Sequence, residues 1–325
     1  MSAFRTLPLG IDIGTTRARI AVAESSRDGG GRLRAIVSRD LPEGSSSSSG
    51  ISDPEIVAIV LEEMLDELGV RERRCVAALS MPSAVLRLVR FPKMSWAERT
   101  RAAAFEAQRF VPWDMSLERS QVRVHASGRS DGLYAVGVTR ADAAETRLRA
   151  LRTARLKPVS IDHDGFALHR MLPHYDAILD IGFERAILHV ADERAPRSWN
   201  APAGGVDITR GIALDLAIDE ASAERRKRIL GAAGAGREAH AGVVARIASM
   251  IERARSRTPI ARIAAVGNGA RVPGLAADIE SAAGTIVEMP VADMLQTADY
   301  PEDVVRAAAP DWTLAAGLAL WANAA

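Results

Sequence analysis

The segment "LGIDIGTTRARIAVAE" (residues 9–24) joins two apolar strands through a tight glycine turn. A second segment, "ILDIGFERAILHVAD" (residues 178–192), repeats the pattern, so that Asp12 aligns with Asp180. A turn of this kind exposes successive backbone N–H groups to an anion, and its glycine allows a close approach. The aspartate repels phosphate but can hold a hydrated Mg²⁺. The repeat therefore predicts two facing hairpins that clamp one polyphosphate and its metal.

The composition restricts the class of protein. The chain has 325 residues, 48% of them hydrophobic, which suits roughly two domains. Lys and Arg total 42 against 41 Asp and Glu, so charge gives no reason to expect nucleic acid or an anionic membrane as a partner. The lone cysteine, Cys75, argues against a disulfide framework or a Cys-rich zinc site and fits a reducing compartment. No signal peptide or membrane-spanning run is expected.

Three parts are expected along the chain. The first contains a serine-rich stretch, "GSSSSSG" (44–50), interpreted as a flexible connector, and a helix that is capped by Asp53. A compact strand–helix–strand–strand–helix unit is inserted at 82–157, where Ser95 and Glu98 predict a capping box. The predicted first domain comprises 1–81, 158–176 and a C-terminal helix at 310–325, and the second comprises 177–309.

Other sequence features do not predict further sites. No G-x-x-x-x-G-K-[ST] sequence is present, which excludes a P-loop. The "DHD" at 162–164 is not predicted to bind metal, because alternate side chains of a strand point to opposite faces. His189, on the return strand of the second hairpin, is expected to be a hydrogen-bonded sheet histidine. No residue stands out as a general base.

Several motifs resemble one known superfamily. "GIDIGTT", "DIG" and "VGNGARVPG" are similar to the phosphate-1, phosphate-2 and adenosine motifs of the actin, sugar-kinase and heat-shock-chaperone superfamily. Within it the chain most resembles the PilM family of type IV pilus assembly, which is related to the divisome protein FtsA. This closer likeness is carried by "ALSMPSAVLRLVRFPKMSWAERTRAAAFEAQRFVPW", "GGVDITRGIA" and "AERRKRIL". The resemblance implies an actin-like (ribonuclease H-like) α/β fold, with two domains (1A and 2A/2B) around a nucleotide cleft and an inserted FtsA-type 1C subdomain.

The resemblance also implies ATP and Mg²⁺ as cofactors. Asp12 and Asp180 would hold Mg²⁺ through water and belong to the nucleotide site. The other residues that it implies for the nucleotide are Gly14, Thr15, Thr16, Arg17, Gly182, Gly204, Gly205, Glu224, Lys227, Gly267, Asn268 and Gly269. By spacing alone, Glu224 and Lys227 would instead form an exposed pair on a charged helix face.

The chain departs from the family pattern in two motifs. Phe183 and Glu184 stand where the family usually has small or hydroxyl residues, and a carboxylate there repels phosphate unless it points away. Asn268 replaces a glycine, which is a mild change because asparagine tolerates left-handed backbone conformations. Nucleotide binding is therefore expected, hydrolysis is expected to be weak or absent, and no catalytic residue is assigned.

The family likeness implies an adaptor of the pilus inner-membrane platform. A groove beside the inserted unit would take the N-terminal peptide of a PilN-like membrane protein, with Trp96, Phe110 and Trp113 as its aromatic residues, unless these form the unit's own core. The further expected partners are pilus motor ATPases and other copies of this chain, which would form a homo-oligomeric ring. The expected location is the cytoplasm, at the inner face of the inner membrane, with membrane contact only through the partner. A small-molecule kinase and an FtsA-like filament are the alternatives.

Overall fold

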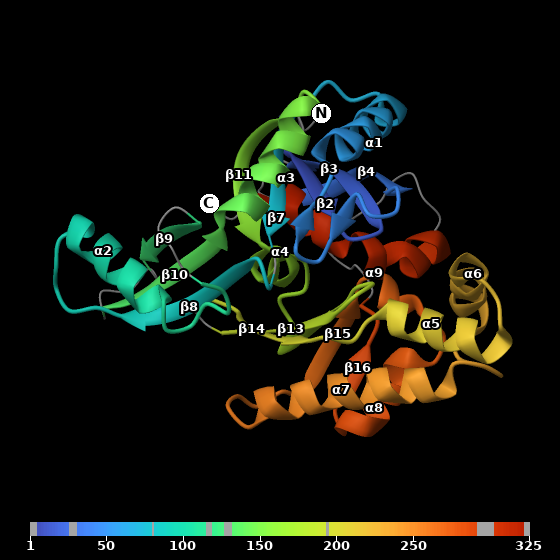
Figure 1. Ribbon diagram of the computed structural model, residues 1–325. Helices are drawn as coiled ribbons and strands as arrows, with labels where there is room; N and C mark the ends of the chain where they lie inside the picture. Colours follow the sequence, from blue (N-terminus) through green and yellow to red (C-terminus); the bar gives the residue numbers. More distant parts are fainter. Residues whose placement is uncertain are drawn as a thin grey trace.

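The computed structural model describes residues 5–25, 31–79, 81–114, 119–126, 132–192, 195–290 and 302–321. Two α/β halves lie one above the other, and a small three-stranded unit projects to one side (Figure 1). Each half is built on its own sheet of antiparallel and parallel strands.

The first half carries the N-terminal sheet. Its elements are β1 (Arg5–Thr6), β2 (Leu9–Ile13), β3 (Arg17–Ser25), β4 (Gly31–Asp40), α1 (Pro54–Leu68), β7 (Arg74–Leu79), α3 (Ala141–Thr153), β11 (Lys157–His163), α4 (Asp164–Met171) and α9 (Glu302–Ala319). The strand order is β1-β3-β2-β7-β11, and β4 also pairs with β3. Helices α1 and α3 cover one face, and α4 and α9 cover the other.

The second half repeats this plan. Its elements are β12 (Ala177–Ile181), β13 (Ala186–Val190), β14 (Arg197–Ala201), α5 (Gly205–Leu216), α6 (Glu220–Leu230), α7 (Arg237–Arg255), β15 (Arg262–Val266), the 3-10 turn η1 (Asn268–Arg271), α8 (Leu275–Ala283) and β16 (Ile286–Glu288). The strand order is β14-β13-β12-β15-β16. Helices α5, α7 and α8 pack on one face, and the other face meets α4 and α9.

Both predicted hairpins are present and have matching turns. The Gly14 N–H donates to the Arg17 carbonyl at 2.9 Å, and the Gly182 N–H donates to the Arg185 carbonyl at 2.8 Å. Each hairpin is extended by a parallel strand, β7 in the first half and β15 in the second. The sequence repeat is therefore also a repeat of backbone structure.

The projecting unit is an antiparallel sheet covered by one helix. Its elements are β8 (Ala84–Arg90), α2 (Trp96–Ala107), β9 (Ser120–Ala126) and β10 (Leu133–Arg140), and the strand order is β8-β10-β9. The predicted capping box of Ser95 and Glu98 is formed at the start of α2. Ala103 of α2 packs with Val136 of β10 in the core of this unit. Helix α3, which follows β10, packs instead against α1, and its Leu151 joins the core of the first half.

The serine-rich stretch is ordered, so the prediction of a flexible connector is wrong. It forms a two-stranded hairpin of β5 (Ser46–Ser47) and β6 (Gly50–Ile51). Ser45 and Ser46 are buried, and the Ser83 hydroxyl donates to the Ser49 carbonyl at 2.9 Å. Composition predicts solvation here, but the stretch is held by hydrogen bonds to nearby segments, such as that of the Ser45 hydroxyl to the Pro42 carbonyl at 2.6 Å.

Helix α9 lies between the two sheets (Figure 1). Its Ala315 and Ala316 belong to a core cluster that includes Ile178 of β12 and Val266 of β15. The helix also approaches β2 very closely, since a Cβ added at Gly10 would lie 1.9 Å from the Ala315 carbonyl oxygen. The two halves therefore share one core through α9.

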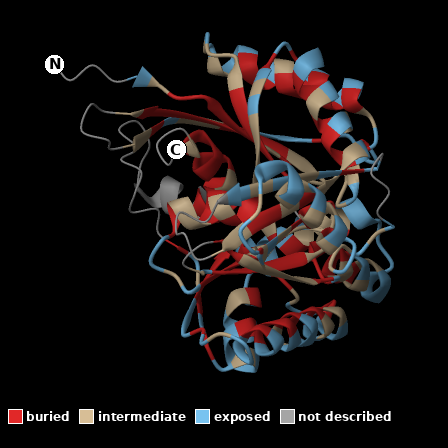
Figure 2. Cartoon of the chain, turned by 90° about the vertical axis from the view of Figure 1, so that its left-hand side faces the viewer, coloured by how far each residue is buried: buried red, intermediate tan, exposed pale blue. Residues whose placement is uncertain are grey.

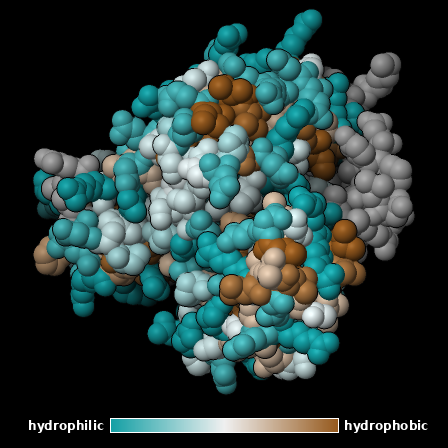
Figure 3. Space-filling model, turned by 45° about the vertical axis from the view of Figure 1, so that its right-hand side comes forward, coloured by the Kyte–Doolittle hydropathy of each residue, from teal (hydrophilic) through white to brown (hydrophobic). Residues whose placement is uncertain are grey.

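The distribution of buried residues follows the packing of the helices on the two sheets. Buried residues lie on both sheets and on the inner sides of the helices, whereas the outer sides are exposed (Figure 2). Apolar patches also reach the surface (Figure 3), and the exposed apolar side chains of the second half include Leu214, Ile229 and Leu230. Within the described ranges, no helix has both the length and the apolar character needed to cross a membrane.

We expect Gly10→Ala to destabilise the protein, because the added methyl group overlaps the backbone of α9. Overpacking of this kind costs about 1–3 kcal/mol and should lower Tm by roughly 2–5 °C in a chain of this length. Thermal unfolding measures the change. Gly137→Ala is the matched control, because its nearest neighbour lies 4.0 Å away. Equal Tm values for the two variants would contradict the close packing of α9 on β2.

Candidate functional site

A cavity of about 400 Å³ lies between the two halves. Its walls come from both hairpin turns, the start of α5, one side of α6, η1 and α9. It brings together every residue that was predicted for nucleotide or metal except Gly204, namely Asp12, Gly14, Thr15, Thr16, Arg17, Asp180, Gly182, Gly205, Glu224, Lys227, Gly267, Asn268 and Gly269.

Arg19 forms buried ion pairs with two aspartates in this cavity. Its Nη1 donates to Asp12 Oδ2 at 2.8 Å, and its Nε donates to Asp311 Oδ1, also at 2.8 Å. The Asn268 amide nitrogen, in the orientation that satisfies both amide atoms, donates to Asp311 at 2.8 Å. Burial raises the pKa of Asp12, and the charges of Arg19 and Arg147 offset only part of this effect.

Asp180 faces the same cavity, and no basic side chain of the described residues forms an ion pair with it. Arg19 lies opposite Asp12 in the first hairpin. At the matching position of the second hairpin, Ile187 lies opposite Asp180. Burial, followed by the negative charges of Asp12 and Asp164, raises the pKa of Asp180 to about 6. The two hairpins therefore share a backbone but differ in charge.

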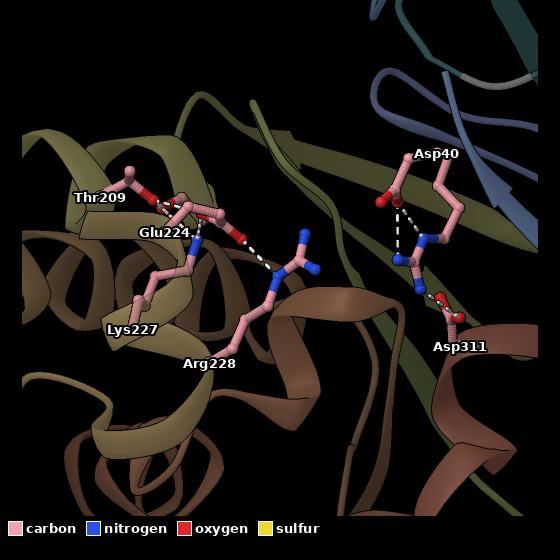
Figure 4. Close-up of polar contacts among 8 residues, drawn as sticks. Asp40, Thr209, Glu224, Lys227, Arg228 and Asp311 are labelled. Atoms are coloured by element: carbon pink, nitrogen blue, oxygen red, sulfur yellow. Dashed lines mark hydrogen bonds and ion pairs between the residues drawn. The ribbon is translucent and has the colours of Figure 1, made fainter. Parts of the chain in front are cut away.

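The first turn holds Arg17 in place through two acidic side chains. The Arg17 Nη2 pairs with Asp40 at 2.6 Å, and its Nη1 lies 3.6 Å from Asp311 (Figure 4). Thr15 and Thr16 are half-buried beside it. The guanidinium is thus fixed at the cavity wall, where it can meet an anion.

Lys227 lies in a polar cluster across the cavity (Figure 4). Its Nζ donates to the Gly205 carbonyl at 2.9 Å and to Thr209 Oγ1 at 2.8 Å. It also donates to Glu224 Oε2 at 2.5 Å, and Arg228 Nε donates to the same carboxylate at 3.0 Å. Lys227 is only 3% exposed, so the spacing-based alternative of an exposed pair is wrong, because α6 packs this side onto α5. Burial lowers the pKa of Lys227, although Glu224 opposes this effect.

Two glycines near the cavity have different roles. Gly204 lies outside the cavity wall, and a Cβ there would lie 2.3 Å from the Phe183 carbonyl oxygen. It therefore allows the start of α5 to rest on the second hairpin turn. Gly267 does line the cavity, with a φ of +83°, and its N–H donates to the Pro310 carbonyl of α9 at 2.7 Å. This backbone conformation favours glycine.

Ser48 of the first half binds the Glu184 carboxylate of the second half. Glu184 Oε2 accepts the Ser48 N–H at 3.1 Å and also contacts the Ser48 hydroxyl. Arg185 Nη2 donates to the same hydroxyl at 2.5 Å. These contacts join the β5–β6 hairpin to the second hairpin turn. They reduce the repulsion that was expected between Glu184 and a phosphate.

The predicted groove aromatics differ in exposure. Trp96, at the start of α2, is 69% exposed. Phe110 and Trp113 are half-buried against the core of the projecting unit, and the Trp113 Nε1 donates to Ser120 Oγ at 3.1 Å. Trp96 is therefore the most accessible of the three.

The sequence analysis missed several cavity residues, among them Arg19, Arg147 and Asp311. Both Arg147 Nη atoms donate to the Ile13 carbonyl at 3.3 Å, which places α3 beside the first turn. Arg19 could have been found from strand pairing opposite Asp12, and Asp311 is an isolated acidic residue in an apolar C-terminal segment. Arg147 has no comparable signal.

Comparisons with known proteins agree with this geometry. The family described as "Type IV pilus assembly protein PilM" matches residues 10–323. The solved "PilM-PilN type IV pilus biogenesis complex" resembles the structure with a TM-score of 0.84 and 26% identity, over 96% of this chain and 97% of that chain. Ethanolamine utilization protein EutJ from Carboxydothermus hydrogenoformans shares the fold, with a TM-score of 0.62 and 15% identity over 97% and 90% of the two chains. No curated protein sequence matches the chain. The predicted actin-like fold is confirmed.

We expect Asp180→Asn to stabilise the protein at neutral pH in the absence of divalent cations. The folded-state pKa of about 6 exceeds the ordinary value, so ionisation destabilises the fold increasingly between pH 4 and 6 and fully above that. The variant should gain about 1–3 kcal/mol at pH 7.5 and nothing near pH 4. Thermal unfolding across this pH range measures the difference.

Asp66→Asn, on the exposed side of α1, is the control and should leave the pH dependence unchanged. A gain in stability from Asp180→Asn that is equal at pH 4 and pH 7.5 would contradict the raised pKa.

Proposed function

The chain belongs to the family of the type IV pilus assembly protein PilM, and we propose that it serves there as a nucleotide-dependent adaptor that docks the N-terminal peptide of a PilN-like membrane protein. The adaptor role in pilus assembly is supported by likeness to the PilM–PilN complex over nearly the whole chain. Neither the kinase nor the filament alternative is favoured by these likenesses.

The cavity between the halves supports nucleotide binding. Its volume of about 400 Å³ falls within the usual range of ligand pockets, about 300–1,000 Å³. It combines two glycine turns, which can bind an anion through backbone N–H groups, with the cations Arg17 and Arg19. The predicted adenosine loop, Gly267 to Gly269, lines the same space. We propose ATP as the ligand.

Mg²⁺ fits the charge of this cavity. Burial and the negative charges of Asp12 and Asp164 raise the pKa of Asp180, and a divalent cation beside its carboxylate would offset both effects. Asp12 already shares its charge with Arg19, so Asp180 is the more available carboxylate. Bound Mg²⁺ would offset phosphate charge between the two hairpins. This proposal concerns the binding of ATP and Mg²⁺ and does not include hydrolysis of ATP.

The partner is proposed to dock on the projecting unit, the 1C subdomain in the proposed domain division. Trp96 offers exposed apolar surface on α2, and Phe110 and Trp113 border the core of this unit. An amphipathic peptide could pack its apolar side chains against this surface. The chain would then lie at the cytoplasmic face of the inner membrane, held there by its partner. Pilus motor ATPases and further copies in a ring are additional proposed partners.

We expect Mg-ATP to bind the wild-type protein in titration calorimetry and to raise Tm. At a ligand concentration one hundred times Kd, the stabilisation should be about 2.7 kcal/mol. Asp12→Ala and Asp180→Ala should each weaken Mg-ATP binding by at least about tenfold, since each removes a metal-holding carboxylate. Asp66→Asn should bind like the wild type. Absence of binding at millimolar Mg-ATP would leave a scaffold that only docks its partner.

We expect a synthetic peptide, with the N-terminal sequence of a PilN-like protein from the same organism, to bind the chain in fluorescence anisotropy. Trp96→Ala should weaken binding by about tenfold or more, as loss of an aromatic anchor does. Phe105→Ala is the matched control, because Phe105 is 67% exposed on the same helix but lies outside the predicted groove. Equal effects of the two substitutions would contradict the proposed groove.

A further inference from the structure

We propose that His163, Asp164 and His189 form a binding site for a transition-metal ion such as Zn²⁺. The proposal does not rest on the proposed nucleotide function, although Asp164 also lines the central cavity. His163 ends β11 and Asp164 begins α4 in the first half, whereas His189 lies on β13 of the second half. Their ligand atoms all lie within 4.8 Å of one another. An ion held by the three would therefore connect the two halves.

The expectation that "DHD" divides across two faces of a strand is wrong, because the strand ends within it. The backbone changes from extended to helical between His163 and Asp164. As a result, both side chains meet the Gly165 N–H, which donates to His163 Nδ1 at 3.1 Å and to Asp164 Oδ1 at 2.8 Å. A Cβ at Gly165 would lie 2.9 Å from His189 Nδ1, so the glycine lets α4 begin directly against the third side chain.

The distances suit a tetrahedral metal shell. His163 Nδ1 lies 3.1 Å from Asp164 Oδ1, and His189 Nε2 lies 3.5 Å from Asp164 Oδ2. Ligand atoms at about 2.0–2.1 Å from a tetrahedral Zn²⁺ are about 3.3 Å apart. The two distances involve different oxygens of Asp164, and His163 Nδ1 accepts the Gly165 N–H. Metal binding would therefore replace that hydrogen bond and turn one carboxylate oxygen toward both imidazoles.

The polar groups of the cluster are deeply buried and only loosely paired. Asp164 and His189 are fully buried, and their Oδ2 and Nε2 atoms form an ion pair with each other at 3.5 Å. Among the described residues, His163 Nε2 has no hydrogen-bond partner, and weak pairing of buried polar groups is costly. The other nitrogen of His189, Nδ1, lies 2.9 Å from Ser198 Oγ on β14. Contacts of this kind orient a metal-binding imidazole. Coordination would thus satisfy the carboxylate and His189 while Ser198 fixes the ring.

The chemistry of the ligands selects the metal. Two imidazoles and one carboxylate favour Zn²⁺ or another late divalent transition metal, whereas Mg²⁺ prefers oxygen ligands. The site therefore differs from the carboxylate pair of Asp12 and Asp180. Three protein ligands leave a fourth position for water or another ligand. Asp164 also lines the central cavity, so a small anion in the cavity could reach the ion.

Titration of the metal-free full-length chain tests this site, with Zn²⁺ in calorimetry and Co²⁺ as a visible-absorption probe. The wild type should bind a single buried ion, gain Tm with Zn²⁺, and show the absorption bands of tetrahedral Co²⁺. His163→Gln and Asp164→Asn should each weaken Zn²⁺ binding by at least about tenfold and lose the Co²⁺ bands. His174→Gln, an exposed histidine after α4, is the matched control and should behave like the wild type.

Circular dichroism and Tm without metal establish that each variant is folded. If Asp164→Asn does not fold, His163→Gln retains the test, because the His163 side chain is 10% exposed and its partners are polar. Unchanged Zn²⁺ affinity in folded His163→Gln would overturn the proposal, as would a wild-type Tm that does not respond to Zn²⁺. Both results can be read whether or not ATP binds, so they are separate from the test of the nucleotide site.

Discussion

The close packing of α9 against β2 is the contact on which the rest of the structure depends. Because Gly10 has no side chain, the helix backbone reaches the strand backbone. The same helix shares a core with the second sheet, so it sets the spacing between the halves. It also carries Asp311 into the cavity, where the carboxylate binds Arg19. One helix therefore determines both the width of the cavity and part of its charge.

The two hairpins have the same backbone structure but different charges beside their aspartates. The turns have the same hydrogen bond, but Arg19 lies opposite Asp12 where Ile187 lies opposite Asp180. Desolvation costs an ionised carboxylate unless a nearby cation offsets it. The first hairpin contains that cation, whereas in the second hairpin the proposed Mg²⁺ would supply it. This asymmetry suits a site that binds a metal-bound polyphosphate from one side.

Polar contacts between the halves connect the cavity to the projecting unit. Ser48 of the first half holds Glu184 and Arg185 of the second. His189 meets Asp164 across the same junction. Strand β14, next to β13, lies beside β8 of the projecting unit. A ligand that changes the relation of the halves would therefore act on β8 as well, which would connect the proposed nucleotide binding to the proposed partner surface.

The sequence by itself determined the local features of this protein. The paired Asp-Ile-Gly hairpins, the Asp53 cap of α1 and the Ser95–Glu98 box were predictable, because each depends on residues only a few positions apart. The tertiary structure decided the rest. Arg19 and Asp311 are 292 positions apart, the ordered serine hairpin depends on contacts with distant segments, and the histidine cluster requires a strand to end beside a second sheet. Pairing of buried charges is set by which distant segments pack together, and no local pattern encodes that.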